Sequence, residues 1–207
     1  MIHVVDAANI SQYRHEMEEV WRLRHKVFVE EKGWTDLAKP DGREIDQFDT
    51  PEAVHLLVME GGAVIGYSRL LPTTRPHLLS EVFPHLCEGD LPRGPRIWEW
   101  TRQAVAPAHR ARGTSRLVTV RLMAGIVEWG MAHGVTSLVT MMPLMYLLPF
   151  LDTHFRAIPL GLPTVIDGER TIAVRAEFDT RTLKRLRTMR GDATPVLATP
   201  MVSEHAA

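Results

Sequence analysis

The chain has 207 residues, of which 45% are hydrophobic and 24% charged, and its formal net charge is -1. This composition is typical of one globular domain that folds without metals, and the single cysteine excludes a disulfide framework or a multi-cysteine zinc site. The near-neutral charge argues against a nucleic-acid partner, and no apolar run reaches the roughly 18 residues of a membrane span. Because the N-terminus also lacks the pattern of a signal peptide, we expect a cytoplasmic protein with no membrane partner.

Apolar periodicity and turn residues predict the elements in chain order. The first half is expected to contain a strand at 1–5, a helix at 10–26, a loop at 29–50, and a β-hairpin of strands 54–59 and 63–71. The second half is expected to contain a loop at 72–95 with a helical piece at 78–86, a strand at 97–105, a helix at 115–133, a strand at 136–142, an interrupted helix at 143–155, a strand at 171–178 and a helix at 180–190. This order predicts one α/β domain over 1–190, with a mixed sheet and helices on its faces, and a loose tail at 191–207.

Two arginines occupy positions that the pattern assigns to the core. Arg24 follows Met17 and Trp21 on one apolar helical face, and Arg69 interrupts an apolar strand. Buried guanidinium groups need carboxylate partners, and Asp46 and Asp49 in the preceding loop are candidates. The alternative is that both arginines extend to solvent along their aliphatic stems.

The strand at 97–105 carries a second candidate group. Strict alternation places Glu99 and Thr101 on one face, and Trp100 and Arg102 on the other. Glu99 and Arg102 can share a site only if a β-bulge resets that alternation, and bulges are frequent beside active sites. The alternative is a solvent-facing Glu99 on an edge strand.

A third candidate lies between that strand and the long helix. Arg110, Arg112 and Gly113 precede a helix start at Ser115, where free N–H groups and arginines can bind a pyrophosphate. The segment lacks the motifs of a nucleotide P-loop or a dinucleotide site, and Ser115 alternatively serves only as a helix cap. No histidine pair has metal-ligand spacing, so no metal site is expected.

Taken together, these residues resemble the LuxI-type acyl-homoserine-lactone synthases, which make bacterial quorum signals. The resemblance covers residues 20–105 and runs in order along the chain. Its positions are Arg24, Phe28, Trp34, Asp46, Asp49, Arg69, Phe83, Glu99 and Arg102. The segments at 40–50 and 70–84 further resemble the branch of the family that uses CoA thioesters, including branched-chain and aryl acyl groups.

The resemblance implies a GNAT-like three-layer α/β/α sandwich with a mixed central sheet. It implies an acyltransferase that uses S-adenosyl-L-methionine as a substrate rather than a cofactor. The amine of that substrate would attack an acyl thioester, and lactonisation would then release methylthioadenosine. Acyl-CoA is the favoured donor, and an acyl-carrier protein is the alternative.

The resemblance also implies roles for individual side chains. Catalysis would involve Glu99, Arg102 and Asp46. S-adenosylmethionine would be bound by Arg24, Phe28, Trp34, Asp46, Asp49, Arg69 and Phe83. The phosphopantetheine arm would be bound by Arg102, Arg110, Arg112, Gly113 and Ser115. The acyl pocket would be lined by Trp100, Thr140, Met141, Met142, Leu144, Met145, Leu148 and Phe150. These last residues could equally form ordinary core.

Two further interpretations remain open from the sequence. One is a generic GNAT N-acyltransferase that acts on another amine, and it would release CoA without S-adenosylmethionine. The other is a non-catalytic regulator that binds one ligand on the same scaffold and releases neither free thiol nor methylthioadenosine.

Overall fold

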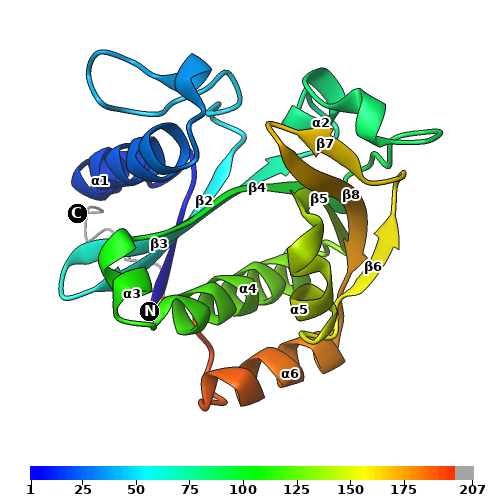
Figure 1. Cartoon of the computed structure of the whole chain (residues 1–207). Helices are drawn as coiled ribbons and strands as arrows, with labels where there is room; N and C mark the ends of the chain where they lie inside the picture. Colours follow the sequence, from blue (N-terminus) through cyan, green and yellow to red (C-terminus); the bar gives the residue numbers. More distant parts are fainter. Residues whose placement is uncertain (199–207) are drawn as a thin grey trace.

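The computed structural model describes residues 1–198 as a central sheet between two layers of helices (Figure 1). The strands are β1 (Ile2–Val5), β2 (Val54–Glu60), β3 (Ala63–Pro72), β4 (Ile97–Val105), β5 (Ser137–Pro143), β6 (Arg156–Pro159), β7 (Thr164–Ile166) and β8 (Glu169–Glu177). The α-helices are α1 (Arg14–Arg24), α2 (Leu78–Glu81), α3 (Pro107–Ala111), α4 (Ser115–Ala132), α5 (Leu147–Leu151) and α6 (Thr180–Arg190). The mixed sheet and the three layers confirm the predicted fold class.

The strands follow the order β1-β2-β3-β4-β5-β8-β6, and β7 pairs with the free part of β8. Neighbouring strands run antiparallel except β4 and β5, which run parallel. Pairing between these two covers only Ile97–Glu99 against Ser137–Val139. Beyond that point the backbones diverge, and the hydroxyl of Thr140 donates to the carbonyl of Trp100 at 2.9 Å.

Each face of the sheet has its own apolar layer. One face packs against α4 through residues such as Val118, Leu122 and Ile126. The opposite face packs against α1 near the hairpin, through Met17 and Val20, and against the α2 segment over β4 and β5. In Figure 1 α1 and α2 lie on one side of the sheet, with α4 and α6 on the other. The candidate site lies on β3 and β4, which α1 and α2 flank on this face.

Several elements differ from the sequence prediction. The helix expected at 10–26 is divided into a 3₁₀ turn at Ile10–Tyr13, α1, and a π-helix at His25–Glu31, so residues 29–31 are helical and not loop. β6 and β7 were not predicted, because four and three residues are too few to show a period of two. A short 3₁₀ turn at Leu144–Tyr146 followed by α5 replaces the interrupted helix at 143–155.

The expected tail is partly anchored. Val196 is buried, its carbonyl accepts from the backbone N–H of Ile2 at 2.8 Å, and Ala198 N–H donates back to Ile2 at 2.7 Å. The carboxylate of Glu128 accepts from Val196 N–H at 2.8 Å. The remainder of the expected tail, 199–207, lies outside the described residues. Within residues 1–198, no helix is both long and apolar enough to cross a membrane.

Candidate active site

Arg24 is fully enclosed and fully paired. Its Nε donates to Glu44 Oε2 at 2.6 Å, while Nη1 and Nη2 donate to the two carboxylate oxygens of Asp49 at 2.7 and 2.9 Å. The exposed fraction of Arg24 is 0%, so the alternative of a solvent-extended side chain is wrong. Because every nitrogen of this guanidinium already has a protein partner, Arg24 holds the loop rather than presenting a free donor.

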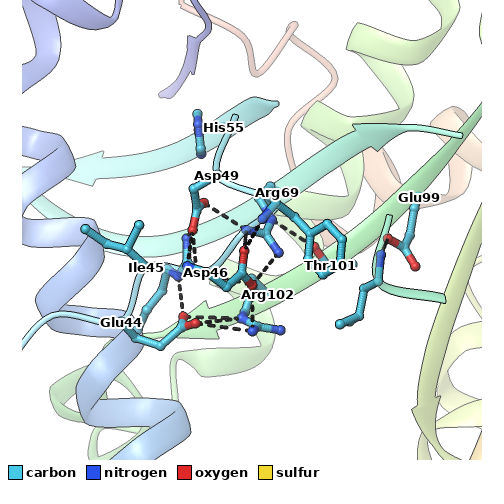
Figure 2. Close-up of polar contacts among 12 residues, drawn as sticks. Glu44, Ile45, Asp46, Asp49, His55, Arg69, Glu99, Thr101 and Arg102 are labelled. Carbon is cyan, nitrogen blue, oxygen red and sulfur yellow. Dashed lines mark hydrogen bonds and ion pairs between the residues drawn. The ribbon is translucent and has the colours of Figure 1, made fainter. Parts of the chain in front are cut away.

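Arg69 ties the same loop to the sheet. Its two terminal nitrogens donate to Asp46 at 2.6 and 2.9 Å, its Nη1 lies 2.8 Å from Asp49, and its Nε donates to Thr101 Oγ1 at 3.2 Å. Arg69 is also 0% exposed. The predicted pairing of Arg24 and Arg69 with Asp46 and Asp49 is thus confirmed, and it fixes residues 44–49 over β3 (Figure 2).

Arg102 reaches this cluster through a β-bulge. Tyr67 pairs with Ala104 and Arg69 with Thr101, so one residue of β3 faces two residues of β4. Arg102 has φ of +54°, a left-handed conformation that costs a non-glycine residue of order 1–3 kcal/mol. The bulge brings its guanidinium onto the face of Thr101, where Nη2 lies 2.7 Å from Asp46.

Glu44 completes the cluster and was not predicted from the sequence. It is 0% exposed and accepts from Arg24 as described and from Arg102 Nε at 3.2 Å. Three arginines therefore meet three carboxylates, from Glu44, Asp46 and Asp49. We call these six residues the charge cluster. Glu44 lies in a segment whose glycine, proline and aspartate indicate a solvated loop, so the sequence pattern does not indicate that its side chain is buried.

Charge and burial act in opposite directions on the carboxyl groups of the charge cluster. Burial alone would raise the pKa of Asp49, but the charges of Arg24 and Arg69 outweigh it and hold that pKa well below its usual range. The pKa of Asp46 is lowered in the same way, with burial opposed by hydrogen bonds and charge from Arg69. Both carboxylates are therefore ionised at neutral pH.

Phe28 in the π-helix and Trp34 just after it form an aromatic pair beside the charge cluster. The rings of Phe28 and Trp34 stack with centroids 5.2 Å apart and planes 10° apart. The guanidinium of Arg102 lies 5.5 Å from the Phe28 centroid and 5.8 Å from that of Trp34. The ammonium of Lys32 also lies 5.3 Å from the Trp34 centroid, so this electron-rich stack already accommodates two cations, as cation–π geometry allows. π-Helices are rare and often occur at functional sites.

Glu99 lies on the same face of β4, two residues before Thr101, and is 1% exposed. Figure 2 shows it to one side of the charge cluster. Its carboxylate accepts from the backbone N–H groups of Leu78 at 2.8 Å and Leu79 at 2.6 Å. The solvent-facing edge position is therefore wrong for Glu99, and the bulge required for it to share a face with Arg102 is present.

Phe83 does not join the other expected S-adenosylmethionine residues. It packs with Leu79 and Leu86 in the small core under α2, whereas Phe28 belongs to the core under α1.

Four of the five residues expected to bind the phosphopantetheine arm lie together around the start of α4, whereas Arg102 lies in the charge cluster. Gly113 has φ of +70°, with open space around the position of a Cβ, and α4 begins at Ser115 without a side-chain cap. Ser115 is therefore not the capping residue; Thr114 holds that position. Arg110 pairs with Glu31 at the end of the π-helix, and Arg112 is exposed.

The expected acyl-pocket residues divide between two faces. Trp100 and Phe150 lie on the α4 face with ring centroids 6.2 Å apart, and Met142 packs against the same core. Met141 points to the opposite face, because side chains alternate along β5. Met145 and Leu148 are exposed, and Leu144 is half-buried in the turn before α5. A single pocket lined by all of these residues is therefore wrong.

Comparison with known proteins agrees with this geometry. A family model described as autoinducer synthase matches residues 9–186. The chain is 39% identical over 184 residues to an isovaleryl-homoserine lactone synthase from Bradyrhizobium diazoefficiens, covering 88% of this chain and 82% of that protein. The structure of BjaI, a CoA-dependent acyl-homoserine lactone synthase with SAM and isopentyl-CoA, has a TM-score of 0.90 at 36% identity, covering 98% of this chain and 95% of that chain.

A more distant structure shows the fold alone. An acyl-CoA N-acyltransferase from Pseudomonas aeruginosa is 19% identical with a TM-score of 0.57, covering 84% of this chain and 97% of that chain. The GNAT-like architecture is thus shared beyond the proteins that resemble this chain in sequence.

Proposed function

The chain belongs to the autoinducer synthase family, and from that premise we propose that it makes an N-acyl-L-homoserine lactone from S-adenosyl-L-methionine and an acyl-CoA. The amine attacks the thioester carbonyl, and the CoA thiol leaves. The homoseryl carboxylate then attacks the carbon beside the sulfonium, and methylthioadenosine leaves. Both substrates are consumed, so the reaction as written needs no cofactor. We expect the reaction to take place in the cytoplasm and its product to serve quorum signalling.

The assignment of the site depends on one observation: the charge cluster joins the 44–49 loop to β3 and β4 beside Glu99. We propose that S-adenosylmethionine lies between the Phe28–Trp34 stack and Glu99. The faces of that stack suit a sulfonium, and Arg102 suits the substrate carboxylate because it remains the least enclosed arginine of the cluster, at 8% exposure. Asp46 orients Arg102, and Arg24 and Arg69 fix the loop that carries Asp46 and Asp49.

Glu99 is the group that we propose as proton acceptor. The ammonium of the substrate must lose a proton before nitrogen can attack, and a carboxylate within reach directly or through one water can take it. Two backbone N–H groups hold the Glu99 carboxylate in place, which supports a fixed position for the acceptor. Lactonisation is intramolecular, so holding the chain in a folded geometry supplies much of its rate.

The acyl donor enters, in this proposal, where β4 and β5 diverge. The exposed start of α4, with Arg110 and Arg112, would receive the phosphates of the donor. The acyl group would lie on the α4 face, where Trp100, Phe150 and Phe155 form one aromatic cluster. All three side chains are buried, which favours a short branched or aryl group over a long straight chain. An acyl-carrier protein as donor remains the alternative.

An assay with the purified protein tests this function directly. The protein is incubated with S-adenosylmethionine and a panel of thioesters, including isovaleryl-CoA, a long straight acyl-CoA, an aryl-CoA and an acyl-carrier protein. We expect free thiol and methylthioadenosine in equal amounts, and a short acyl-homoserine lactone by mass spectrometry. Thiol release that does not require S-adenosylmethionine indicates a generic acyltransferase, and release of neither product indicates a ligand-binding regulator.

Glu99→Gln tests the acceptor within that function. We expect the variant to fold and turnover to fall about 10²-fold or more, the usual scale for a positioned base. Lactone formation by the variant at close to the wild-type rate would remove Glu99 from the mechanism.

A further inference from the structure

A second titratable side chain lies against Glu99 and has no role in the chemistry described so far. His77 is 0% exposed, and its Nδ1 lies 3.4 Å from Glu99 Oε1. Within residues 1–198 neither ring nitrogen has a hydrogen-bond partner. A buried polar group left unpaired costs about 1–3 kcal/mol, and an apolar side chain of similar size would avoid that cost. Stability alone therefore does not account for a histidine here.

The backbone holds this imidazole in place. The N–H of His77 donates to Ser80 Oγ at 3.0 Å, and its carbonyl accepts from the N–H groups of Ser80 and Glu81. The next two residues donate their N–H groups to Glu99. One turn of chain therefore fixes both the carboxylate and the imidazole beside it.

The reaction requires more than one proton acceptor. An ammonium that becomes an amide nitrogen loses two protons: one before it attacks and one as the amide forms. The departing thiolate takes up one of these protons, and the other must leave the site. A single carboxylate holds one proton at a time, so Glu99 alone cannot accept the second while it retains the first.

We propose that Glu99 and His77 form a two-site proton acceptor for the acylation step. Glu99 takes the first proton from the substrate ammonium and transfers it to Nδ1 of His77. The carboxylate, ionised again, takes the second proton from nitrogen as the amide forms and gives it to the departing CoA thiolate. His77 later releases its proton to water. His77 thus acts through Glu99, and this inference rests on the proposed function.

Few other titratable groups face this pair. Cys87, from the chain after the Pro84–Leu86 turn, has its thiol pKa raised by burial and by the charge of Glu99. Arg69 and Asp46 lie further along the same face, with Thr101 between them and Glu99. Among the described residues, the one ion-pair contact of His77 is with Glu99. Proton transfer from Glu99 therefore has one adjacent acceptor.

Two variants separate proton transfer from mere positioning. His77→Asn keeps a polar amide close to the place of Nδ1 but cannot take up a proton, and His77→Phe removes both the polar group and the proton acceptor. His133→Gln is the matched control, because His133 lies on the exposed end of α4 and caps the carbonyl of Trp129 at 2.7 Å. Thiol release is measured from about pH 6 to about pH 9, and binding of S-adenosylmethionine is measured by calorimetry.

We expect both His77 variants to lower kcat about tenfold or more near pH 7, with substrate affinity unchanged. The difference in kcat between variant and wild type should shrink as pH rises toward the pKa of the substrate amine, about 8, because a smaller fraction of the substrate then carries an ammonium that must be deprotonated. Wild-type turnover in His77→Asn, a deficit that is independent of pH, or lost substrate binding in His77→Asn would overturn the proposal. A wild-type protein that makes no thiol or methylthioadenosine would instead overturn the proposed function on which it rests.

Discussion

Glu44→Gln removes one of three carboxylates from the charge cluster and leaves three buried guanidinium groups facing two carboxylates. Glu44 is 0% exposed and bridges Arg24 at 2.6 Å and Arg102 at 3.2 Å. Removal of one partner from a buried ion pair typically costs about 3–5 kcal/mol, because the remaining charge is buried without compensation. We therefore expect the free energy of unfolding to fall by about that amount.

Urea unfolding at neutral pH measures the effect, with Glu18→Gln as the control. Glu18 also bridges two arginines, Arg22 at 2.8 Å and Arg43 at 3.4 Å, but its side chain is 33% exposed. Each of these partly exposed ion pairs should contribute less than about 1 kcal/mol to the free energy of unfolding. Adding Arg102→Gln to Glu44→Gln restores the charge balance, so the double variant should be at least about 1 kcal/mol more stable than additivity predicts. Equal losses in Glu44→Gln and Glu18→Gln would refute the reasoning.

Two further predictions concern pH and the acyl donor. Burial lowers the pKa of His55 to about 4 from 6.5, so its contribution to stability is complete above pH 6.5 and is lost as pH falls through that interval. His55→Asn should therefore remove up to about 3 kcal/mol of the acid destabilisation between those pH values, measured by urea titration against His133→Gln; an unchanged slope would contradict this. Arg110→Gln should raise KM for acyl-CoA about fivefold or more without changing the affinity for S-adenosylmethionine or the melting point, because its ion pair with Glu31 is exposed. An unchanged KM would remove Arg110 from the donor site.

The sequence predicted the sheet and the charge cluster well because both depend on strong local contrasts. Apolar runs bounded by turn residues marked five of the eight strands at nearly their observed bounds, and a sixth strand from Thr171. Arg24 and Arg69 stood out as charges within apolar patterns, and burial of such groups requires carboxylates. Glu44 could have been predicted by the same reasoning. A third buried arginine, Arg102, requires a third carboxylate, and Glu44 lies two residues before Asp46.

The rest depended on geometry that the pattern does not encode. The bulge at Arg102 is set by pairing between β3 and β4, which are separated by more than twenty residues. The π-helix follows α1 without a change in residue type, so Phe28 and Trp34 could be expected near each other only from the family resemblance. The family resemblance placed Met141 and Trp100 in one pocket, and the alternation of side chains along β5 separates them.

The most direct test of the account is a crystal structure of the protein with S-adenosylmethionine bound. We expect the sulfonium to lie against the Phe28–Trp34 stack, the carboxylate at Arg102, and the ammonium within hydrogen-bond reach of Glu99 directly or through one water. A substrate bound elsewhere, or one whose ammonium lies far from Glu99, would contradict it.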